Sequence, residues 1–336
     1  MNNKFGEIVS KITDIGKEWH SNDLLKNAQR NSKYVKKSLK DLGELTGAKG
    51  ESAIVISAGP SVHKFEVMDK IKNSNFKGSI IAVDGSYVKC LKNGIYPDYV
   101  LSIDPHPTRI VRWFGDPDFE KHMKGDDYFT RQDLDVEFRN NTIKENVQNI
   151  NLVNEHAYKT KLILCSSAPE NVVSRSIEAQ FDTYWWNPIV DNPREEGSLT
   201  KEIYKTNKLP CMNTGGTVGT AAWLFADSIL KVKDIAVLGM DLGYHYETPY
   251  TMTQTYYELK EFASDEVKLK DLFMEFTFPL DGKKYYTDPT YYWYRKNMLE
   301  LLQRGSANTF NCTEAGTLYG DGIKCIKFQD FLARFD

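Results

Sequence analysis

Apolar and polar residues are arranged in two different ways along the chain. Between residues 5 and 46, apolar residues recur every three or four positions in a polar background, which predicts two or three amphipathic helices. From residue 52 onward, short continuous apolar runs are each followed by glycine, proline or aspartate. Such runs are typical of strands that are buried on both faces of a parallel sheet. The predicted strands are 53–58, 79–83, 99–103, 149–153, 161–165 and 234–239.

Helical patterns lie between these strands, so the chain alternates between strand and helix. This alternation predicts an α/β fold, with a doubly wound, mostly parallel Rossmann-like sheet and right-handed crossovers. The expected helices are 62–73, 86–93, 217–230, 290–303 and 327–335, with a short strand or loop at 308–319.

The pattern divides the chain into three parts. Residues 1–50 form an N-terminal helical segment, and we expect it to pack on the main domain, with self-association as the alternative. Residues 51–245 form the nucleotide-binding domain, in which the charged and aromatic stretch 105–145 predicts an insertion. Residues 246–336 form a helical lid and the closing helices of the same domain, and tyrosines are dense around the start of this part.

Composition excludes several classes of protein. The 336 residues carry a formal charge of −3. A nucleic-acid-binding protein is typically basic, so this charge argues against that class. No run of about 18 apolar residues is present, and the N-terminus has no apolar signal-peptide core, so we expect neither a membrane span nor secretion. The five cysteines form no CxxC pair and match no zinc module, which favours a cytoplasmic protein.

Ligands of open parallel sheets bind beyond the carboxyl ends of the strands, so the turns that follow the strands are the candidate site. The first predicted strand runs into Gly59, Pro60 and Ser61. Gly59 permits close backbone approach, Pro60 suits the first turn of a helix, and Ser61 offers a hydroxyl and an amide. Helix N-termini attract phosphate, although a plain serine-capped turn explains the same residues.

Two further turns carry aspartates. Asp84, followed by Gly85 and Ser86, ends the second predicted strand, where an acid can bond a ribose hydroxyl. An Asp-Gly turn that caps the next helix is an equal alternative. Asp104 ends the third strand before Pro105, which holds it extended. There, a contact to metal or substrate and an ordinary Asp-Pro turn both remain open.

The last two turns are expected to converge at one edge of the sheet. One offers small residues and backbone amides as an anion cradle at a helix start. Its sequence is Asn213-Thr214-Gly215-Gly216-Thr217. In the other turn Asp241 follows a buried strand, where a carboxylate is costly unless it is bonded. Tyr244 and His245 come next, as candidates to donate to a leaving phosphate or to accept a proton.

Six motifs occur in order along the chain. They are NSKYVKKSL at 31–39, GPS at 59–61, GIYPDYVLSIDP at 94–105, NTGGTVGTAA at 213–222, GMDLGY at 239–244 and NCTEAG at 311–316. Together they resemble the motility accessory factor (Maf) family, whose members share the MptE-like, or DUF115, domain. Its members are similar in fold to bacterial sialyltransferases, so the resemblance implies a sialyltransferase-like sheet, a GT-A variant.

The resemblance also implies an activity. Members are thought to move a nonulosonic sugar, such as pseudaminic or legionaminic acid, from a CMP donor to Ser or Thr of flagellin or another surface protein. The mechanism would be a single inverting displacement. The donor would be a substrate, with no tightly bound cofactor and no assigned metal ligand. The partners would be the donor and an acceptor protein, and the N-terminal helices could join copies into a homo-oligomer.

Roles follow by position in the matched motifs. The 59–61 and 213–216 turns would cradle the nucleotide and its phosphate, and Asp84 and Asp241 would lie near the ribose, base or sugar. Tyr244 or Tyr250 would stabilise the departing phosphate. His245 is the last histidine of the chain and the candidate general base, with Glu247 and Glu314 as fallbacks.

Two alternatives stay open. A 6-hydroxymethylpterin diphosphokinase of the MptE-like branch would use ATP and Mg²⁺, which requires clustered carboxylates. The segment SIDPHP has only one acid, which favours the glycosyltransferase. A non-catalytic nucleotide-binding scaffold would need no base and would tolerate substitution of Tyr244 and His245.

Overall fold

A parallel sheet forms the centre of the computed structural model, which describes residues 3–44, 51–106, 108, 110–124, 136–263 and 268–335. Its strands are β1 (Ser52–Ile56), β2 (Ser79–Val83), β3 (Tyr99–Ser102), β4 (Lys161–Cys165), β5 (Asp182–Ile189), β6 (Cys211–Asn213), β7 (Asp234–Leu238), β11 (Asn308–Asn311) and β12 (Ile323–Cys325). Their order is β12-β11-β7-β1-β2-β3-β4-β5-β6, and each neighbouring pair is parallel. The α/β fold with a large parallel sheet is therefore confirmed.

The strand order reverses beside β1. The chain moves outward from β1 to β6, and then returns to place β7 on the other side of β1, followed by β11 and β12. Ligands of such sheets bind at this reversal, outside the carboxyl ends of the strands. The turns after β1 and β7 therefore occupy the switch point of the fold.

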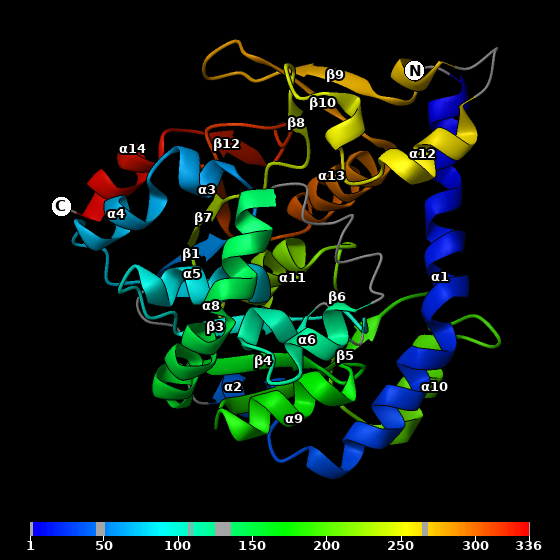
Figure 1. The fold of residues 1–336 in the computed structure, drawn as a ribbon, viewed down its shortest axis with the longest axis vertical. Coiled ribbons are helices and arrows are strands. Elements are labelled where there is room, and N and C mark those ends of the chain that lie inside the picture. The colour runs from blue at the N-terminus through cyan, green and yellow to red at the C-terminus, as the bar shows by residue number, and fades with distance from the viewer. Residues whose placement is uncertain are drawn as a thin grey trace.

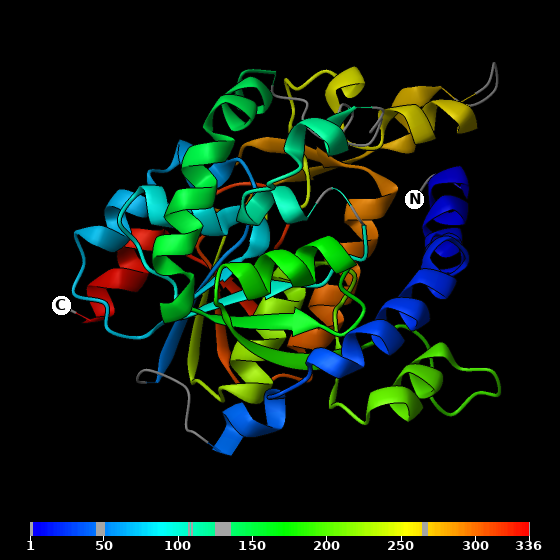
Figure 2. The same ribbon diagram turned by 60° about the horizontal axis from the view of Figure 1, so that its bottom comes forward.

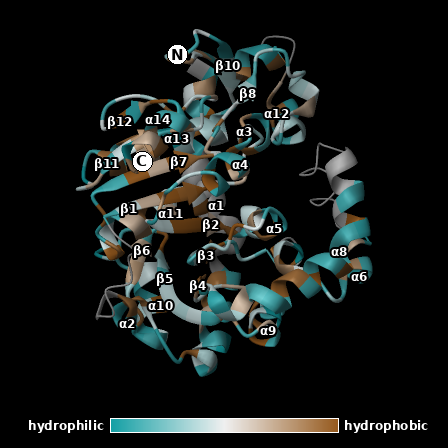
Figure 3. Ribbon diagram, turned by 90° about the vertical axis from the view of Figure 1, so that its left-hand side faces the viewer, coloured by the Kyte–Doolittle hydropathy of each residue, from teal (hydrophilic) through white to brown (hydrophobic). Residues whose placement is uncertain are grey.

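Helices cover both faces of the sheet (Figure 1). One layer holds α2 (Leu39–Glu44), α11 (Val218–Leu224) and α13 (Pro289–Leu302). The other holds α3 (Ser61–Lys64), α4 (Val67–Lys72), α5 (Asp84–Lys92), α8 (Val136–His156), α9 (Glu170–Glu178) and α14 (Phe328–Leu332). Ala53 and Val55 of β1 belong to the first core, while Ile54 and Ile56 belong to the second. The continuous apolar run of β1 is explained by this burial on both faces, and Figure 3 shows the central strands as the most hydrophobic part.

The N-terminal segment packs on the main domain, as its amphipathic pattern indicates. It forms one long helix, α1 (Asn3–Asn31), then a 3₁₀ turn and α2. Figure 1 and Figure 2 show α1 running along one side of the molecule beside α10 (Leu199–Asn207). Asn27 and Asn31 donate to the carbonyls of Ser167 and Ser166, at 3.0 and 2.8 Å, which fixes α1 to the loop after β4.

Several element predictions were wrong in detail. The strand expected at 149–153 lies inside α8. Val153 of this helix is buried in the core that α8 shares with α5, α9 and the sheet. The strand β5 was missed because Asn187 and Pro188 interrupt its apolar pattern, although its central residues are buried. The helix expected at 62–73 divides into α3 and α4 at Glu66, which has a φ of 51°.

The Tyr-rich part forms a second sheet instead of a purely helical lid. Its strands β8 (Tyr244–His245), β10 (Lys284–Thr287) and β9 (Met274–Thr277) pair antiparallel in that order, next to α12 (Tyr256–Phe262). Of the insertion expected at 105–145, residues 107, 109 and 125–135 lie outside the described part. The rest holds a 3₁₀ turn, α6 (Phe119–Met123) and the start of α8, between β3 and β4. No helix in the described ranges is long and apolar enough to cross a bilayer.

Candidate active site at the carboxyl edge of the sheet

The turns after β1 and β7 touch each other at the switch point. The amide of Gly59 donates to the carbonyl of Gly239 at 2.9 Å. A Cβ at Gly59 would lie 2.0 Å from Oδ2 of Asp241 and 2.4 Å from the Gly239 carbonyl, so only glycine fits there. The close backbone approach predicted for Gly59 therefore occurs, and it is made against the neighbouring turn.

Asp241 is buried at this contact. Its Oδ2 accepts a hydrogen bond from Oγ of Ser61 at 2.8 Å. Burial raises the pKa of Asp241 to about 6, while the Ser61 hydrogen bonds and the charge of Lys64 act in the opposite direction. The carbonyl of Asp241 accepts from the amide of Thr317 at 2.9 Å, so the chain after β11 closes over it. The carboxylate that the sequence predicts to need a partner has one in Ser61.

The start of α11 reaches the same place from the far edge of the sheet. Thr217 caps this helix, and its Oγ1 accepts from the amide of Thr220 at 3.0 Å. Two residues on, a Cβ at Gly219 would lie 2.7 Å from Oγ of Ser57 and 3.0 Å from Cε of Met240. The start of α11 therefore meets both strand-end turns at Gly219, and the convergence predicted for the Asn213–Thr217 turn itself stays a prediction.

The amides of the Asn213–Thr217 turn are bonded within the turn. Gly215 donates to Oδ1 of Asn213 at 2.9 Å, and Gly216 donates to Oγ1 of Thr214 at 3.2 Å. Gly216 also packs beneath α13, where a Cβ would lie 2.4 Å from the ring of Trp293. The cradle role of this turn stays a prediction, and it requires these amides to exchange their internal bonds for a phosphate.

Two carboxylates lie at the ends of the neighbouring strands β2 and β3. Oδ1 of Asp84 accepts from the amide of Gly85 at 2.7 Å, and Oδ1 of Asp104 accepts from the amide of His106 at 2.8 Å. Burial raises the pKa of Asp104 to about 7, and the neighbouring charge of Asp84 adds to this. Ser86 fixes the same turn to β1 by donating to the carbonyl of Ile56 at 2.7 Å.

The predicted catalytic tyrosines lie in or beside the small sheet and contact other side chains there. Tyr244 donates to Oδ2 of Asp288 at 3.1 Å, and Tyr250 stacks on Phe273 with ring centroids 4.5 Å apart. Burial raises the pKa of Tyr244 and that of Tyr250. The imidazole of His245 is partly exposed beside Glu247, with 3.6 Å between Nδ1 and Oε2. Their catalytic roles stay predictions.

Two further tyrosines of this region are influenced by the charge of Asp241, and Glu314 holds the last helix. The charge of Asp241 contributes to the raised pKa of Tyr285 and of Tyr291, in each case after burial. The sequence gives no signal that separates these tyrosines from the others. Glu314, a fallback base, accepts from the amide of Phe328 at 3.0 Å and so holds the start of α14.

A pocket of about 660 Å³ lies on the same edge, beyond β3 and β4. Its walls come from α1, the segment after β3, α6 and α9, and we call it the α1–α9 pocket. None of the predicted site residues lines it, although Pro105, next to Asp104, does. Along the edge, Gly85 connects this side to the switch point, because a Cβ there would lie 3.1 Å from Ala58 and 3.8 Å from Trp113.

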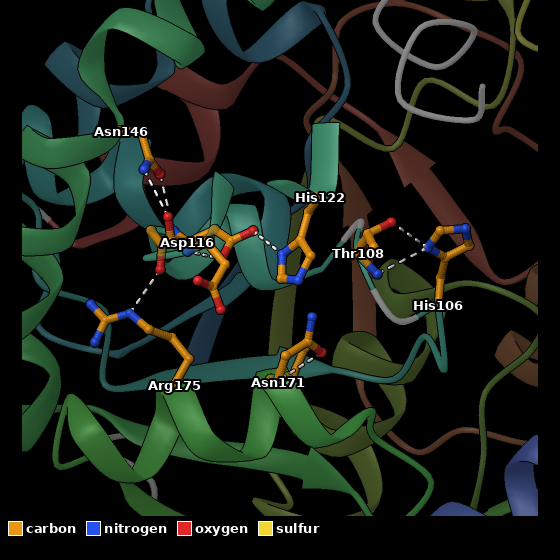
Figure 4. Close-up of polar contacts among 10 residues, drawn as sticks. His106, Thr108, Asp116, His122, Asn146, Asn171 and Arg175 are labelled. Carbon is orange, nitrogen blue, oxygen red and sulfur yellow. Dashed lines mark hydrogen bonds and ion pairs between the residues drawn. The ribbon is translucent and has the colours of Figure 1, made fainter. Parts of the chain in front are cut away.

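A histidine and an aspartate form a pair at the wall of this pocket (Figure 4). Nδ1 of His122 lies 2.6 Å from Oδ2 of Asp116, whose side chain is 2% exposed. Neither residue is predicted from the sequence, because both lie in a polar stretch, GDPDFEKH, that ends no strand. Among the described residues, no group of three or more His, Cys, Asp or Glu side chains is arranged to hold a metal ion.

Comparison with known proteins supports part of the resemblance. Residues 22–119 match the model of the family described as 6-hydroxymethylpterin diphosphokinase MptE-like. This match confirms the MptE-like resemblance over the first three strands and includes Gly59, Asp84, Asp104 and Asp116. No curated protein matches the chain.

Among solved structures, this chain is similar to a Maf glycosyltransferase from Magnetospirillum magneticum AMB-1. The two chains share 14% sequence identity, and their superposition has a TM-score of 0.47. The similarity covers 93% of this chain and 41% of that protein, so the chain spans about two fifths of its length.

Proposed function

We propose that this protein is a glycosyltransferase that moves a nonulosonic sugar from a CMP-activated donor to a Ser or Thr hydroxyl of an acceptor protein. The observation that carries the proposal is the convergence of the turns after β1 and β7 with the start of α11 at the switch point. The six motifs that resemble the Maf family supply the choice of donor.

In this proposal the switch point holds the donor. Gly59, Pro60 and Ser61 supply a tight turn and a hydroxyl near the phosphate, and Asp84 and Asp241 face the ribose or the sugar. The Asn213–Thr217 turn contributes amides at the start of α11. Donors aimed at the leaving phosphate stabilise the charge that develops on it, which is usually the largest contribution to such catalysis.

A panel of nucleotides tests the proposal. CMP is expected to raise the melting temperature of the protein more than UDP or ATP at equal concentration, because a ligand that binds only the native state stabilises it. If ATP raises the melting temperature more than CMP does, and only with Mg²⁺ present, the result would favour a kinase over the glycosyltransferase. No effect of any nucleotide would contradict both functions.

A diphosphokinase of the MptE-like type is the second candidate. The family match over residues 22–119 favours it, and so does one observation in the structure. A single acid follows β3, but Asp84 from the end of β2 is close enough to add to the raised pKa of Asp104. Two neighbouring carboxylates are the ligands that a Mg²⁺–ATP complex prefers. Asp84→Asn would then abolish the effect of Mg²⁺ on ATP binding, whereas CMP binding in a glycosyltransferase would not depend on Mg²⁺.

A further inference from the structure

The loop that carries Asp116 is held rigidly. Gly115 has a φ of 75°, and a Cβ there would lie 2.7 Å from the backbone of Ile150. The buried guanidinium of Arg175 donates through Nε to the carbonyls of Phe114 and Gly115, at 3.0 and 2.8 Å. Asn146 then fixes Asp116 itself, accepting from its amide at 3.0 Å and donating to its carbonyl at 2.8 Å. Asp116 therefore has a single position relative to α6.

This rigid carboxylate fixes the orientation and tautomer of His122. Oδ1 of Asp116 accepts from the amide of Asp118 at 2.9 Å, and Oδ2 faces Nδ1 of His122. A carboxylate can only accept, so Nδ1 carries the proton, and in the neutral ring Nε2 carries the lone pair. Among the residues that the structure describes, Nε2 has no hydrogen-bond partner. Figure 4 shows the ring between Asp116 and Asn171, both of which line the pocket.

The charges of the pocket determine what it accepts. Five acidic residues line it, namely Asp23, Asp116, Asp118, Glu170 and Glu178. The two arginines of the wall offset part of this charge, since Nη1 of Arg175 lies 3.5 Å from Oε2 of Glu178, and Arg30 donates to Asn27 and to the carbonyl of Ala168, each at 2.8 Å. Five acidic residues against two arginines leave the wall negatively charged. An acidic wall repels the phosphate of a donor, and it suits a neutral or cationic molecule that carries a hydroxyl.

The pocket is close enough to the switch point to serve one reaction. Adjacent strands lie ~4.8 Å apart, so β1 and β3 are separated by about 10 Å. Pro105 of the pocket wall directly follows Asp104, whose neighbour Asp84 lies beside the turn after β1. A nucleotide sugar that is held at the switch point therefore reaches toward the pocket along the edge of the sheet.

We infer that the α1–α9 pocket is the acceptor site and that His122, oriented by Asp116, is the general base of the transfer; this rests on the proposed function. Nε2 takes the proton of the acceptor hydroxyl while its oxygen bonds to the anomeric carbon. The bond from that carbon to the phosphate oxygen breaks, and CMP leaves with the electron pair. His122 is the catalytic residue, and Asp116 is the positioning residue.

The test separates catalysis from donor binding. CMP release from CMP-N-acetylneuraminic acid is measured with a Ser/Thr-containing peptide, and the Kd of CMP is measured by calorimetry. His122→Gln is expected to lower kcat by about 10²–10⁴-fold, with the Kd of CMP unchanged within twofold. His156→Gln is the matched control, because His156 pairs with Glu155 and packs on Tyr96 outside the pocket. It should change neither quantity.

Chemical rescue distinguishes a base from a structural histidine. Imidazole added to His122→Gly should restore part of the lost rate, and it should not accelerate the wild-type protein. Asp116→Asn should lower kcat with the Kd of CMP unchanged, and added imidazole should not rescue it.

Each contrary outcome identifies what has failed. His122→Gln with more than a tenth of the wild-type kcat, or a His122→Gly variant without rescue, would overturn the base role. Wild-type protein that binds CMP but releases none from the donor with the peptide would overturn the transfer reaction and with it the base role, and would leave only nucleotide binding. Wild-type protein that does not bind CMP would overturn the proposed function and the base role together.

Discussion

The switch point and the α1–α9 pocket lie on the same edge of one sheet but are built differently. At the switch point, glycines bring two turns into van der Waals contact, and the buried carboxylate of Asp241 is bonded to Ser61. At the pocket, the carboxylate of Asp116 is also buried, but its partner His122 lies at the wall of a cavity of about 660 Å³. The first arrangement fixes backbone, while the second leaves a reactive nitrogen in reach of a ligand.

This difference separates stability from chemistry. The contact between the two turns leaves no room for an added side chain, so substitutions of the glycines at this contact should destabilise the protein as well as inactivate it. Side chains that line a cavity have few packing partners on that side, so changes there should spare stability. Four predictions test the contrast, from the largest expected effect to the smallest.

Gly59→Ala should lower the free energy of unfolding by about 3 kcal/mol, because the added methyl overlaps the Gly239 carbonyl and the Asp241 carboxylate. Urea unfolding measures the loss. Gly282→Ala is the control: its φ is 69° but no atom lies within 4 Å of the added methyl, so it should cost only about 1 kcal/mol. Equal losses in the two variants would show that the turns are not in tight contact.

Asp104→Asn should change how stability depends on pH. The pKa of Asp104 rises from 3.8 to about 7 on folding, so the native state binds more protons than the unfolded chain between these values. The stability that this proton gives is present below pH 3.8 and is lost as the pH rises through about 7. The Asn variant lacks this loss, so its stability relative to wild type should increase by about 1–3 kcal/mol between pH 4 and 8. Parallel stability curves would contradict the burial of this carboxyl group.

Ser61→Ala should cost about 1–2 kcal/mol, because it removes the hydroxyl that donates to the buried Asp241. The loss should be larger at pH 8 than at pH 5, since the charged form of Asp241 has most need of the donor and its pKa is about 6. Urea unfolding at the two pH values measures it. Ser174→Ala, at an exposed position of the pocket wall, is the control and should leave stability unchanged.

His122→Gln should change the free energy of unfolding by less than about 0.5 kcal/mol, since its side chain lines a cavity and the glutamine amide can still donate to the buried Asp116. The same urea titration used for Gly59→Ala gives the value. A loss as large as that of Gly59→Ala would mean that His122 packs as a structural residue, and the contrast between the two regions would be lost.

The sequence predicts the sheet well where strands are buried on both faces. The runs that became β1, β2, β3, β4 and β7 are continuous and apolar, so periodicity alone identifies them. Periodicity fails at β5, which contains the polar but buried Asn187. Hydrogen bonds to Ser166 and Asn207 satisfy its side chain, and only the tertiary structure provides these contacts. Periodicity also fails at 149–153, where a helix that begins at Val136 continues through an apolar run.

The candidate site divides in the same way. Strand-end glycines and aspartates such as Gly59 and Asp241 are recognisable because each follows an apolar run directly. His122 and Asp116 are not, because their pairing depends on Arg175 and Asn146, which are distant in sequence and hold the loop in place. No local pattern marks a histidine whose partner is fixed from other helices.

Amide hydrogen exchange with and without CMP tests most directly whether the two regions divide the work between donor and acceptor. CMP should slow exchange at residues 57–61, 84–86 and 239–242 and leave the pocket segments 115–123 and 170–178 unaffected. Protection confined to those pocket segments would contradict the account, because the nucleotide would then occupy the place assigned to the acceptor.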